Sequence, residues 1–261
     1  MGLPAEKLVI ATNENDILDR FWKTGRYEKK PVHGVEAQGG IPEDGVKAHE
    51  DGVKETLSPA MDILVSSNFE RLLWFLACGY AAEAKFDDEW NKKQAGQEVE
   101  SWLKQLKSKG GFAVLPEILE AAKKDFESER VSDAETIETI KRFYAIPSTN
   151  GNTNGTSGNE GGYILDPHSA IGVAASLRSI KRSPETYHIS LSTAHPAKFS
   201  NAVELALKDE SGFSFDTVLP EEFVGLEQKE KRVITVPRDA GWEGVRTIVE
   251  DEVEKELRNS H

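Results

Sequence analysis

The chain has 261 residues, of which 38% are hydrophobic and 30% charged, a composition typical of globular proteins with one large or two small domains. Its formal net charge of −13 repels phosphate backbones and anionic lipid surfaces, which excludes non-specific nucleic-acid or membrane binding. No apolar run approaches the roughly 18 residues of a membrane span, and residues 1–7 lack the features of a secretory signal. We therefore expect a cytoplasmic protein with neither nucleic acid nor membrane as a partner.

The chain begins with a predicted strand, a loop and a helix. Lys7–Thr12 is a β-prone run that ends in the polar turn Asn13–Asp16. Helical spacing of apolar residues resumes at Ile17 and Phe21. Residues 31–54 are rich in glycine and contain few apolar side chains, so they predict a long mobile insertion.

Helices are predicted through the middle of the chain. Ser67 and Glu70 have the spacing of a capping box, which predicts the start of an apolar helix. The single cysteine, Cys78, falls in that helix and is interpreted as a buried structural thiol with no disulfide partner. Apolar residues recur at helical intervals within 86–109, among many charges, and predict surface helices.

A second capping box, at Ser132 and Glu135, predicts another amphipathic helix. The polar, low-complexity stretch at 148–162 follows it and predicts a second mobile loop, because it has no apolar area to bury.

Two strand–turn–helix units come next. Their predicted strands are 163–165 and 187–191, their turns are Asp166–Ser169 and Ser192–His195, and their helices are 170–180 and 197–207. Proline stands near the start of each helix, where its missing N–H is harmless. The repeated pattern is typical of a parallel α/β sheet. With a late strand at 232–236 and a charged helix at 242–257, it predicts an α/β fold with a mainly parallel sheet flanked by helices.

Three polar turns are expected at the carboxyl ends of strands, where α/β proteins bind ligands. They are Asn13–Asp16, Asp166–Ser169 and Ser192–His195. The same residue types are ordinary helix N-caps, so capping and ligand binding both remain open for each turn. His168 and His195 have no third ligand at a recognisable spacing, and no metal site is expected.

Five blocks of sequence, taken in order, resemble blocks of the threonine synthases of the fungal and enterobacterial type. They are Leu8–Leu18, Thr56–Ile63, Ser67–Leu72, Leu165–Gly172 and Ser192–Phe199. Both glycine-rich segments fall between blocks, where insertions are tolerated. The resemblance implies that residues 1–261 are the C-terminal part of a fold-type II pyridoxal-phosphate (PLP) enzyme. Such an enzyme is a carbon–oxygen lyase that converts O-phospho-L-homoserine and water to L-threonine and phosphate.

The resemblance also implies roles for individual residues. Thr193 matches the family's contact to the pyridine nitrogen of PLP, and a neutral hydroxyl can donate to that nitrogen when it is unprotonated. Asn68 and Arg71 are weaker candidates for binding the phosphate or carboxylate of the substrate, with pairing of Arg71 to a carboxylate as the alternative. Asp166 and His168 are candidates for lining the substrate pocket, with N-capping as the alternative for Asp166.

One departure from the family decides what the chain can do alone. Members carry the Schiff-base lysine and a Gly-Asn-Phe-Gly phosphate-binding loop upstream of the first block, and neither motif occurs in this sequence. Lys198 belongs to the block of Thr193 and does not match that lysine. We therefore expect no catalytic residue here, no turnover without the missing N-terminal half, and exposed apolar surface on the N-terminal strand and helix. A non-catalytic remnant that acts as an interaction or regulatory module is the alternative.

Overall fold

The computed structural model describes residues 4–29, 53–82, 87–146, 162–231 and 233–259. The chain divides into two compact units, residues 1–219 and 220–261. The insertions predicted at 31–54 and 148–162 lie almost entirely outside the described residues. Among the described helices, none is both long enough and apolar enough to span a bilayer.

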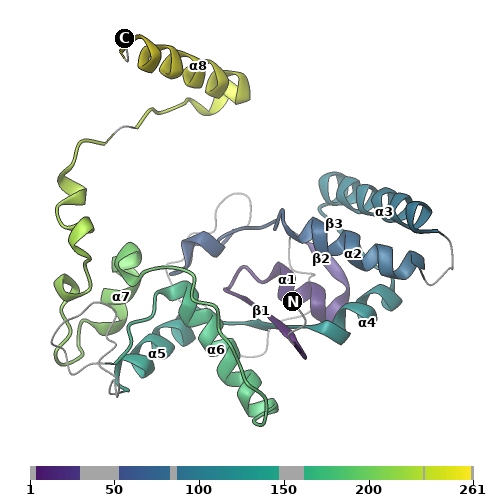
Figure 1. Ribbon diagram of the computed structural model, residues 1–261, viewed down its shortest axis with the longest axis horizontal. Coiled ribbons are helices and arrows are strands. Elements are labelled where there is room, and N and C mark those ends of the chain that lie inside the picture. The colour runs from purple at the N-terminus through teal and green to yellow at the C-terminus, as the bar shows by residue number, and fades with distance from the viewer. Residues whose placement is uncertain (1–3, 30–52, 83–86, 147–161, 232, 260–261) are drawn as a thin grey trace. The chain divides into compact units, whose positions relative to one another are not determined.

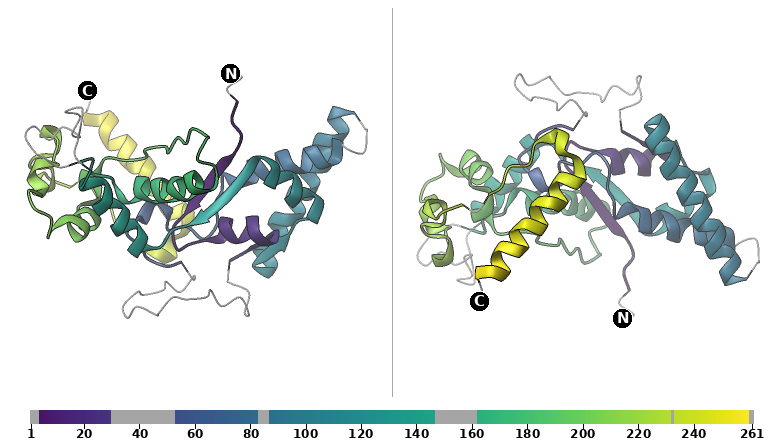
Figure 2. Two further views of the ribbon diagram at one scale, coloured as in Figure 1. Left: turned by 90° about the horizontal axis from the view of Figure 1, so that it is seen from below. Right: turned by 90° about the horizontal axis from the view of Figure 1, so that it is seen from above.

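The strands of the described residues form two small sheets in the first unit (Figure 1). β1 (Leu8–Thr12) runs parallel to β4 (Phe126–Arg130), and β2 (Arg26–Glu28) runs antiparallel to β3 (Gly111–Ala113). Figure 2 shows the purple β1 beside the teal β4. A parallel pair needs a long connection between its strands, and helices occupy that connection here. The predicted α/β character is confirmed, with less parallel sheet than expected.

The helices between β1 and β4 are α1 (Ile17–Thr24), α2 (Phe69–Ala82), α3 (Asp88–Lys109) and α4 (Pro116–Asp125). α2 begins two residues after the predicted cap Ser67. The turn before it is closed by the Phe69 N–H, which donates to the Ser66 carbonyl (3.2 Å). The predicted surface segment 86–109 contains α3, a single helix of 22 residues. Its Trp102 face is buried, and α3 packs against α2 (Figure 1).

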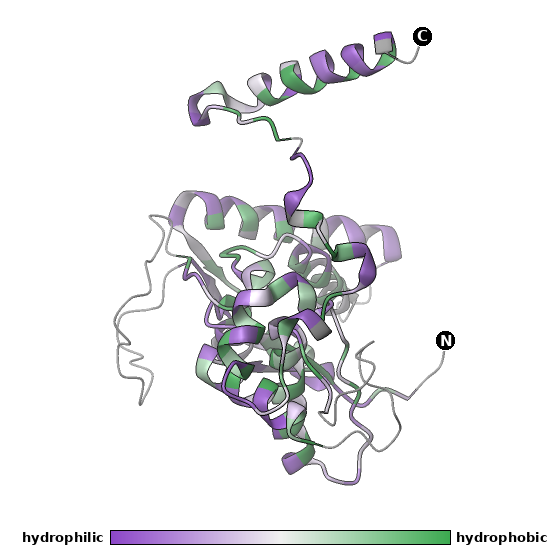
Figure 3. Cartoon of the chain, turned by 90° about the vertical axis from the view of Figure 1, so that its left-hand side faces the viewer, coloured by the Kyte–Doolittle hydropathy of each residue, from purple (hydrophilic) through white to green (hydrophobic). Residues whose placement is uncertain are grey.

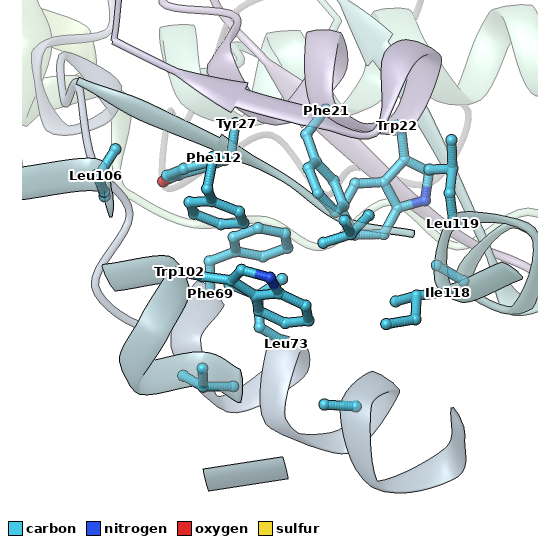
Figure 4. Close-up of a cluster of buried hydrophobic side chains, with 14 of the residues drawn as sticks. Phe21, Trp22, Tyr27, Phe69, Leu73, Trp102, Leu106, Phe112, Ile118 and Leu119 are labelled. Carbon is cyan, nitrogen blue, oxygen red and sulfur yellow. The ribbon is translucent and has the colours of Figure 1, made fainter. Parts of the chain in front are cut away.

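The main core lies where α1, α2 and α3 meet the small antiparallel sheet (Figure 4). Phe21 is 0% exposed, and its ring centroid lies 5.0 Å from those of both Trp22 and Phe69. Trp102 stacks on Phe112 with an interplanar angle of 8°. Rings in edge and offset contact bury large apolar areas in favourable geometry, so this aromatic cluster holds the four elements together.

A second core joins α5 (Asp133–Tyr144), α6 (Pro167–Arg182) and α7 (Ser200–Leu207). Its buried side chains include Ile140, Tyr144, Leu165, Ala170, Val203 and Leu207. α7 follows a 3-10 turn, η2 (Pro196–Phe199), so the helix predicted at 197–207 forms in two parts. This core supports the start of α6 from one side.

Ion pairs tie the C-terminal half of α6 to β4. Arg178 Nη1 donates to the Glu129 carboxylate (2.9 Å) and to the Arg130 carbonyl (2.8 Å). Arg182 pairs with Glu127 (3.1 Å) and with Glu129. α6 is therefore fixed to the parallel sheet at its far end.

The capping box predicted at the start of α5 is confirmed. Ser132 Oγ accepts the Glu135 N–H (3.3 Å), and Glu135 Oε2 accepts the Ser132 N–H (2.9 Å). Ser132→Ala is expected to lower the free energy of unfolding by about 1 kcal/mol in urea melts, because one helix-end N–H loses its acceptor. The control is Ser108→Ala on α3, whose exposed hydroxyl bonds only a helix carbonyl. An equal loss in both variants would contradict the assignment.

Three predicted strands are wrong. Residues 163–165, 187–191 and 233–236 have no strand partner within the described residues. A β-prone sequence forms a strand only where another backbone presents its N–H and C=O groups alongside. In 187–191 the consequence is visible, since Tyr187, Ile189 and Leu191 are 99%, 84% and 78% exposed. The apolar surface expected on the N-terminal strand and helix is found only in part, since Leu8 of β1 is 54% exposed whereas Phe21 and Trp22 of α1 are buried.

The second unit consists of short 3-10 turns and one long helix. The turns are η4 (Glu221–Phe223), η5 (Leu226–Gln228) and η6 (Arg238–Ala240), and the helix is α8 (Gly241–Asn259). The helix predicted at 242–257 is thereby confirmed. Its exposed apolar side chains are Trp242, Val245, Val249, Val253 and Leu257. Their spacing of three and four residues places them along one stripe of α8 (Figure 3).

Candidate functional site

Asp166 caps the N-terminus of α6. Its carboxylate is 1% exposed and accepts the backbone N–H groups of His168 (2.9 Å) and Ser169 (3.4 Å), and Pro167 follows it at the first helical position. Its second oxygen, Oδ2, accepts the Ser169 hydroxyl. The N-cap alternative for Asp166 is therefore realised, and the carboxylate also holds two side chains.

Both ring nitrogens of His168 are engaged. Nε2 accepts the Ala60 N–H (3.1 Å) and so carries no proton, which leaves the proton on Nδ1, 3.0 Å from Asp166 Oδ1. The ring also lies against Phe199, with centroids 4.3 Å apart. Because His168 is only 7% exposed, it links the start of α6 to the Ala60 turn and presents no free nitrogen to solvent.

The pKa of Asp166 is lowered in the folded chain. Burial by itself raises the pKa of this carboxyl, but the hydrogen bonds from His168 and Ser169 outweigh burial and hold it below its ordinary value. Asp166 is therefore a carboxylate, and only an acceptor, at neutral pH.

The second turn meets the third through Ser169. Ser169 Oγ accepts the backbone N–H of Thr193 (3.0 Å) and lies 3.4 Å from both Thr193 Oγ1 and Ser192 Oγ. Ser169 is buried, whereas Ser192 and Thr193 are exposed. The next residues also cap a helix, since His195 Nδ1 accepts the Ala197 N–H (3.2 Å) at the start of η2.

The first turn joins the same network through the segment 56–62. Asn13 is 1% exposed, and its side-chain amide lies within donating distance of Ser58 Oγ (3.0 Å) and Asp62 Oδ1 (2.8 Å). The same segment contains η1 (Pro59–Met61), whose Ala60 N–H bonds His168. The three predicted turns are thus parts of one hydrogen-bonded cluster at one edge of the parallel sheet.

Asn68 and Arg71 lie elsewhere, at the start of α2. Asn68 Oδ1 accepts the Ser66 hydroxyl (2.9 Å) and is exposed. Arg71 lines a groove of about 550 Å³ between α2 and α3, together with Trp74 and Leu103. Within the described residues, no hydrogen bond joins Asn68 or Arg71 to the cluster around Asp166, and their substrate role stays a prediction.

Sequence reasoning did not single out Ser169 or the Ala60 N–H. A serine in the first helical turn is common, and a backbone donor carries no sequence signal. The one available signal was that Ser169 stands three residues after the capping Asp166, where its side chain can reach back to the cap.

Comparison with known proteins finds threonine synthases similar to this chain. The family described as threonine synthase, C-terminal, matches residues 169–249. The threonine synthase of Saccharomyces cerevisiae is 47% identical over 258 residues, which cover 98% of this chain and 43% of that protein. The Schizosaccharomyces pombe enzyme is 48% identical over 238 residues, which cover 90% of this chain and 40% of that protein.

Solved structures agree. The crystal structure of yeast threonine synthase matches with a TM-score of 0.73 at 44% identity, over 98% of this chain and 43% of that one. The X-ray structure of PLP-bound threonine synthase from Brucella melitensis matches with a TM-score of 0.58 at 32% identity, over 90% of this chain and 38% of that one. The α/β fold is therefore that of a fold-type II PLP enzyme. By sequence and structure the chain is similar to the C-terminal part of the threonine synthases, and it spans about 43% of the yeast enzyme's length. The resemblance predicted from the five sequence blocks is confirmed.

Proposed function

We propose that this chain forms the C-terminal part of a cytoplasmic threonine synthase, a carbon–oxygen lyase that converts O-phospho-L-homoserine and water to L-threonine and phosphate with PLP. The observation that carries this proposal is the match to the yeast enzyme along 98% of the chain. The hydrogen-bonded cluster that presents Thr193 supports it. The remaining N-terminal half of the enzyme is the partner that completes the site.

The residues present fit the ring nitrogen of PLP. Thr193 carries an exposed hydroxyl at the edge of the cluster. The neighbouring Ser169 hydroxyl donates to Asp166, so the Thr193 hydroxyl is the donor in its 3.4 Å contact with Ser169 and can donate to a ligand in place of that long bond. A neutral hydroxyl donor suits an unprotonated pyridine nitrogen.

When bound, PLP supplies an electron sink for the substrate. This chain's own residues orient that ring and the groups around it. Thr193 donates to the ring nitrogen, and Asp166 and His168 hold the turns in place, since their polar atoms are already engaged within the protein. Arg71 offers the planar guanidinium that a phosphate or carboxylate of the substrate requires, with Asn68 beside it.

A fused protein tests the proposal. The part of the Saccharomyces cerevisiae enzyme that precedes the matched region is joined to this chain, giving what we call the fused synthase. It is expected to bind PLP, seen by absorbance, and to release phosphate from O-phospho-L-homoserine, whereas the chain alone releases none. A folded fused synthase without PLP absorbance contradicts the proposal and favours the non-catalytic interaction or regulatory module. Turnover by the chain alone would contradict the requirement for the N-terminal half.

Thr193→Ala in the fused synthase is expected to lower kcat by about tenfold, the worth of one hydrogen bond to the cofactor ring. Its effect on the free energy of unfolding is expected to stay within about 0.5 kcal/mol, because the side chain is exposed. Thr247→Ala on α8, another exposed threonine, is the control for activity. Unchanged kcat at full PLP occupancy would refute the contact.

A further inference from the structure

Ser169 is the point where α6 and the turn of Thr193 meet. Ser169 is 2% exposed, and its hydroxyl has four polar neighbours. They are Asp166 Oδ2, the Thr193 N–H at 3.0 Å, Thr193 Oγ1 at 3.4 Å and Ser192 Oγ at 3.4 Å. Capping of α6 requires only Asp166, so the contacts of Ser169 to the 192–193 turn go beyond holding the helix.

The direction of each hydrogen bond follows from the carboxylate. Asp166 can only accept, so the single hydroxyl proton of Ser169 points to Asp166. Toward Thr193 the Ser169 oxygen can then only accept, and it takes the backbone N–H. Ser169 consequently has no proton to give to Thr193 Oγ1. In the 3.4 Å contact between the two hydroxyls Thr193 is therefore the donor, and it can exchange this long hydrogen bond for one to a ligand.

A glycine on the same face of α6 permits the close approach of this segment. Gly172 lies three residues after Ser169, which places it one turn along the helix. A Cβ built on Gly172 would lie 2.9 Å from Ser190 Oγ, closer than side chains tolerate. Residues 190–193 therefore run close to the first turns of α6. Ser169 makes the polar contact between the two segments, and the lack of a side chain at Gly172 leaves room for Ser190.

We propose that Ser169 is a positioning residue for cofactor binding, which fixes the backbone of Thr193 and leaves the Thr193 hydroxyl proton available to the pyridine nitrogen of PLP. This inference rests on the proposed function. Ser169 does not touch the cofactor and acts through Thr193. Asp166 sets the direction of these hydrogen bonds, since its carboxylate accepts the Ser169 hydroxyl.

A double-mutant cycle in the fused synthase tests the inference, with the PLP dissociation constant measured by titration and the melting temperature of the cofactor-free protein measured alongside. Ser169→Ala and Thr193→Ala are each expected to raise the PLP dissociation constant about tenfold. The double variant is expected to bind within about twofold of Thr193→Ala alone, because Ser169 acts through the side chain already removed.

Two further variants separate positioning from packing. Ser179→Ala removes another buried serine of α6, whose hydroxyl lies 3.1 Å from His188 Nε2 and outside the cluster. It is expected to lower the melting temperature as Ser169→Ala does, yet leave PLP affinity within about twofold. Ser169→Thr retains the hydroxyl and is expected to restore most of the affinity. If Ser169→Ala does not fold, Gly172→Leu takes its place. A leucine side chain is too large for a rotation of Ser190 alone to accommodate, so it displaces residues 190–193 with every hydroxyl intact and should weaken PLP binding.

The outcomes are distinct. Fully additive losses in the double variant, or an equal affinity loss in Ser179→Ala, overturn the positioning role while the proposed function stands. A Gly172→Leu protein that binds PLP as tightly as the parent does the same. A parent fused synthase that folds without binding PLP overturns the proposed function, and this inference with it.

Discussion

Replacing Asp166 with alanine is expected to lower the free energy of unfolding at pH 7 by about 3 kcal/mol, since the variant loses a helix N-cap and leaves buried donors unpaired. The carboxylate accepts the His168 and Ser169 N–H groups, the His168 ring N–H and the Ser169 hydroxyl, all in a site that is 1% exposed. Without it, α6 loses its start and the two turns lose their common acceptor.

The stability lost in Asp166→Ala is expected to decrease at acidic pH. The pKa of Asp166 is lower in the folded chain than in the unfolded chain, where it is about 3.9. Its stabilisation is therefore fully present above that unfolded value and decreases as the pH falls toward the folded pKa. The difference in unfolding free energy between the parent chain and Asp166→Ala should accordingly be constant from pH 7 to about pH 5 and shrink below about pH 4.

A matched control exists on another helix. Asp87 is the N-cap of α3 and accepts the Trp90 N–H (2.8 Å), but its side chain is exposed. Asp87→Ala is expected to cost about 1 kcal/mol, as an ordinary exposed cap does. Chemical denaturation of the three proteins across pH measures both differences. Equal losses at the two caps would show that the additional contacts of Asp166 contribute nothing to stability.

Phe21→Ala is expected to cost about 4 kcal/mol, the largest effect of any substitution considered for this chain. Phe21 is 0% exposed, and its ring contacts those of Trp22, Tyr27 and Phe69, which come from three different elements. Removing the ring leaves a cavity that these neighbours cannot fill without losing their own edge contacts.

Phe75→Ala is the control for Phe21→Ala. Phe75 is an aromatic residue of α2 that is 67% exposed, so its loss should change the free energy of unfolding by less than about 1 kcal/mol. Thermal or urea unfolding of both variants supplies the comparison. A loss below about 1.5 kcal/mol in Phe21→Ala would show that the aromatic cluster is not the main core.

Local patterns in the sequence predicted the local structure well. The strand at Leu8–Thr12, the helix after it and the capping box at Ser132 all depend on residues within a few positions of one another. β4 was not predicted, because Phe126–Arg130 is a polar run whose strand character comes from pairing with β1, more than a hundred residues away in sequence. The same dependence on distant partners explains the failed strand at 187–191, where an ideal β sequence has no pairing neighbour in the described residues.

The candidate site divides in the same way. Its three turns were predicted from the strand–turn–helix pattern, and Asp166 as an N-cap follows from the proline after it. The bond from Ala60 to His168, and the contact of Ser169 with Thr193, join segments that are 108 and 24 residues apart. No spacing rule covers such contacts, so the shape of the cluster required the folded chain.

The contacts at the two ends of α6 couple the turn of Thr193 to β4. At its start, the helix is hydrogen-bonded to the turn of Thr193, and at its far end Arg178 and Arg182 form ion pairs with β4. Because both ends of the helix are bonded to neighbouring segments, a change at one end can be transmitted to the other. Ordering of the Thr193 turn by a bound ring is therefore expected to stabilise β4 through α6, and slower amide hydrogen exchange along Phe126–Arg130 would record it.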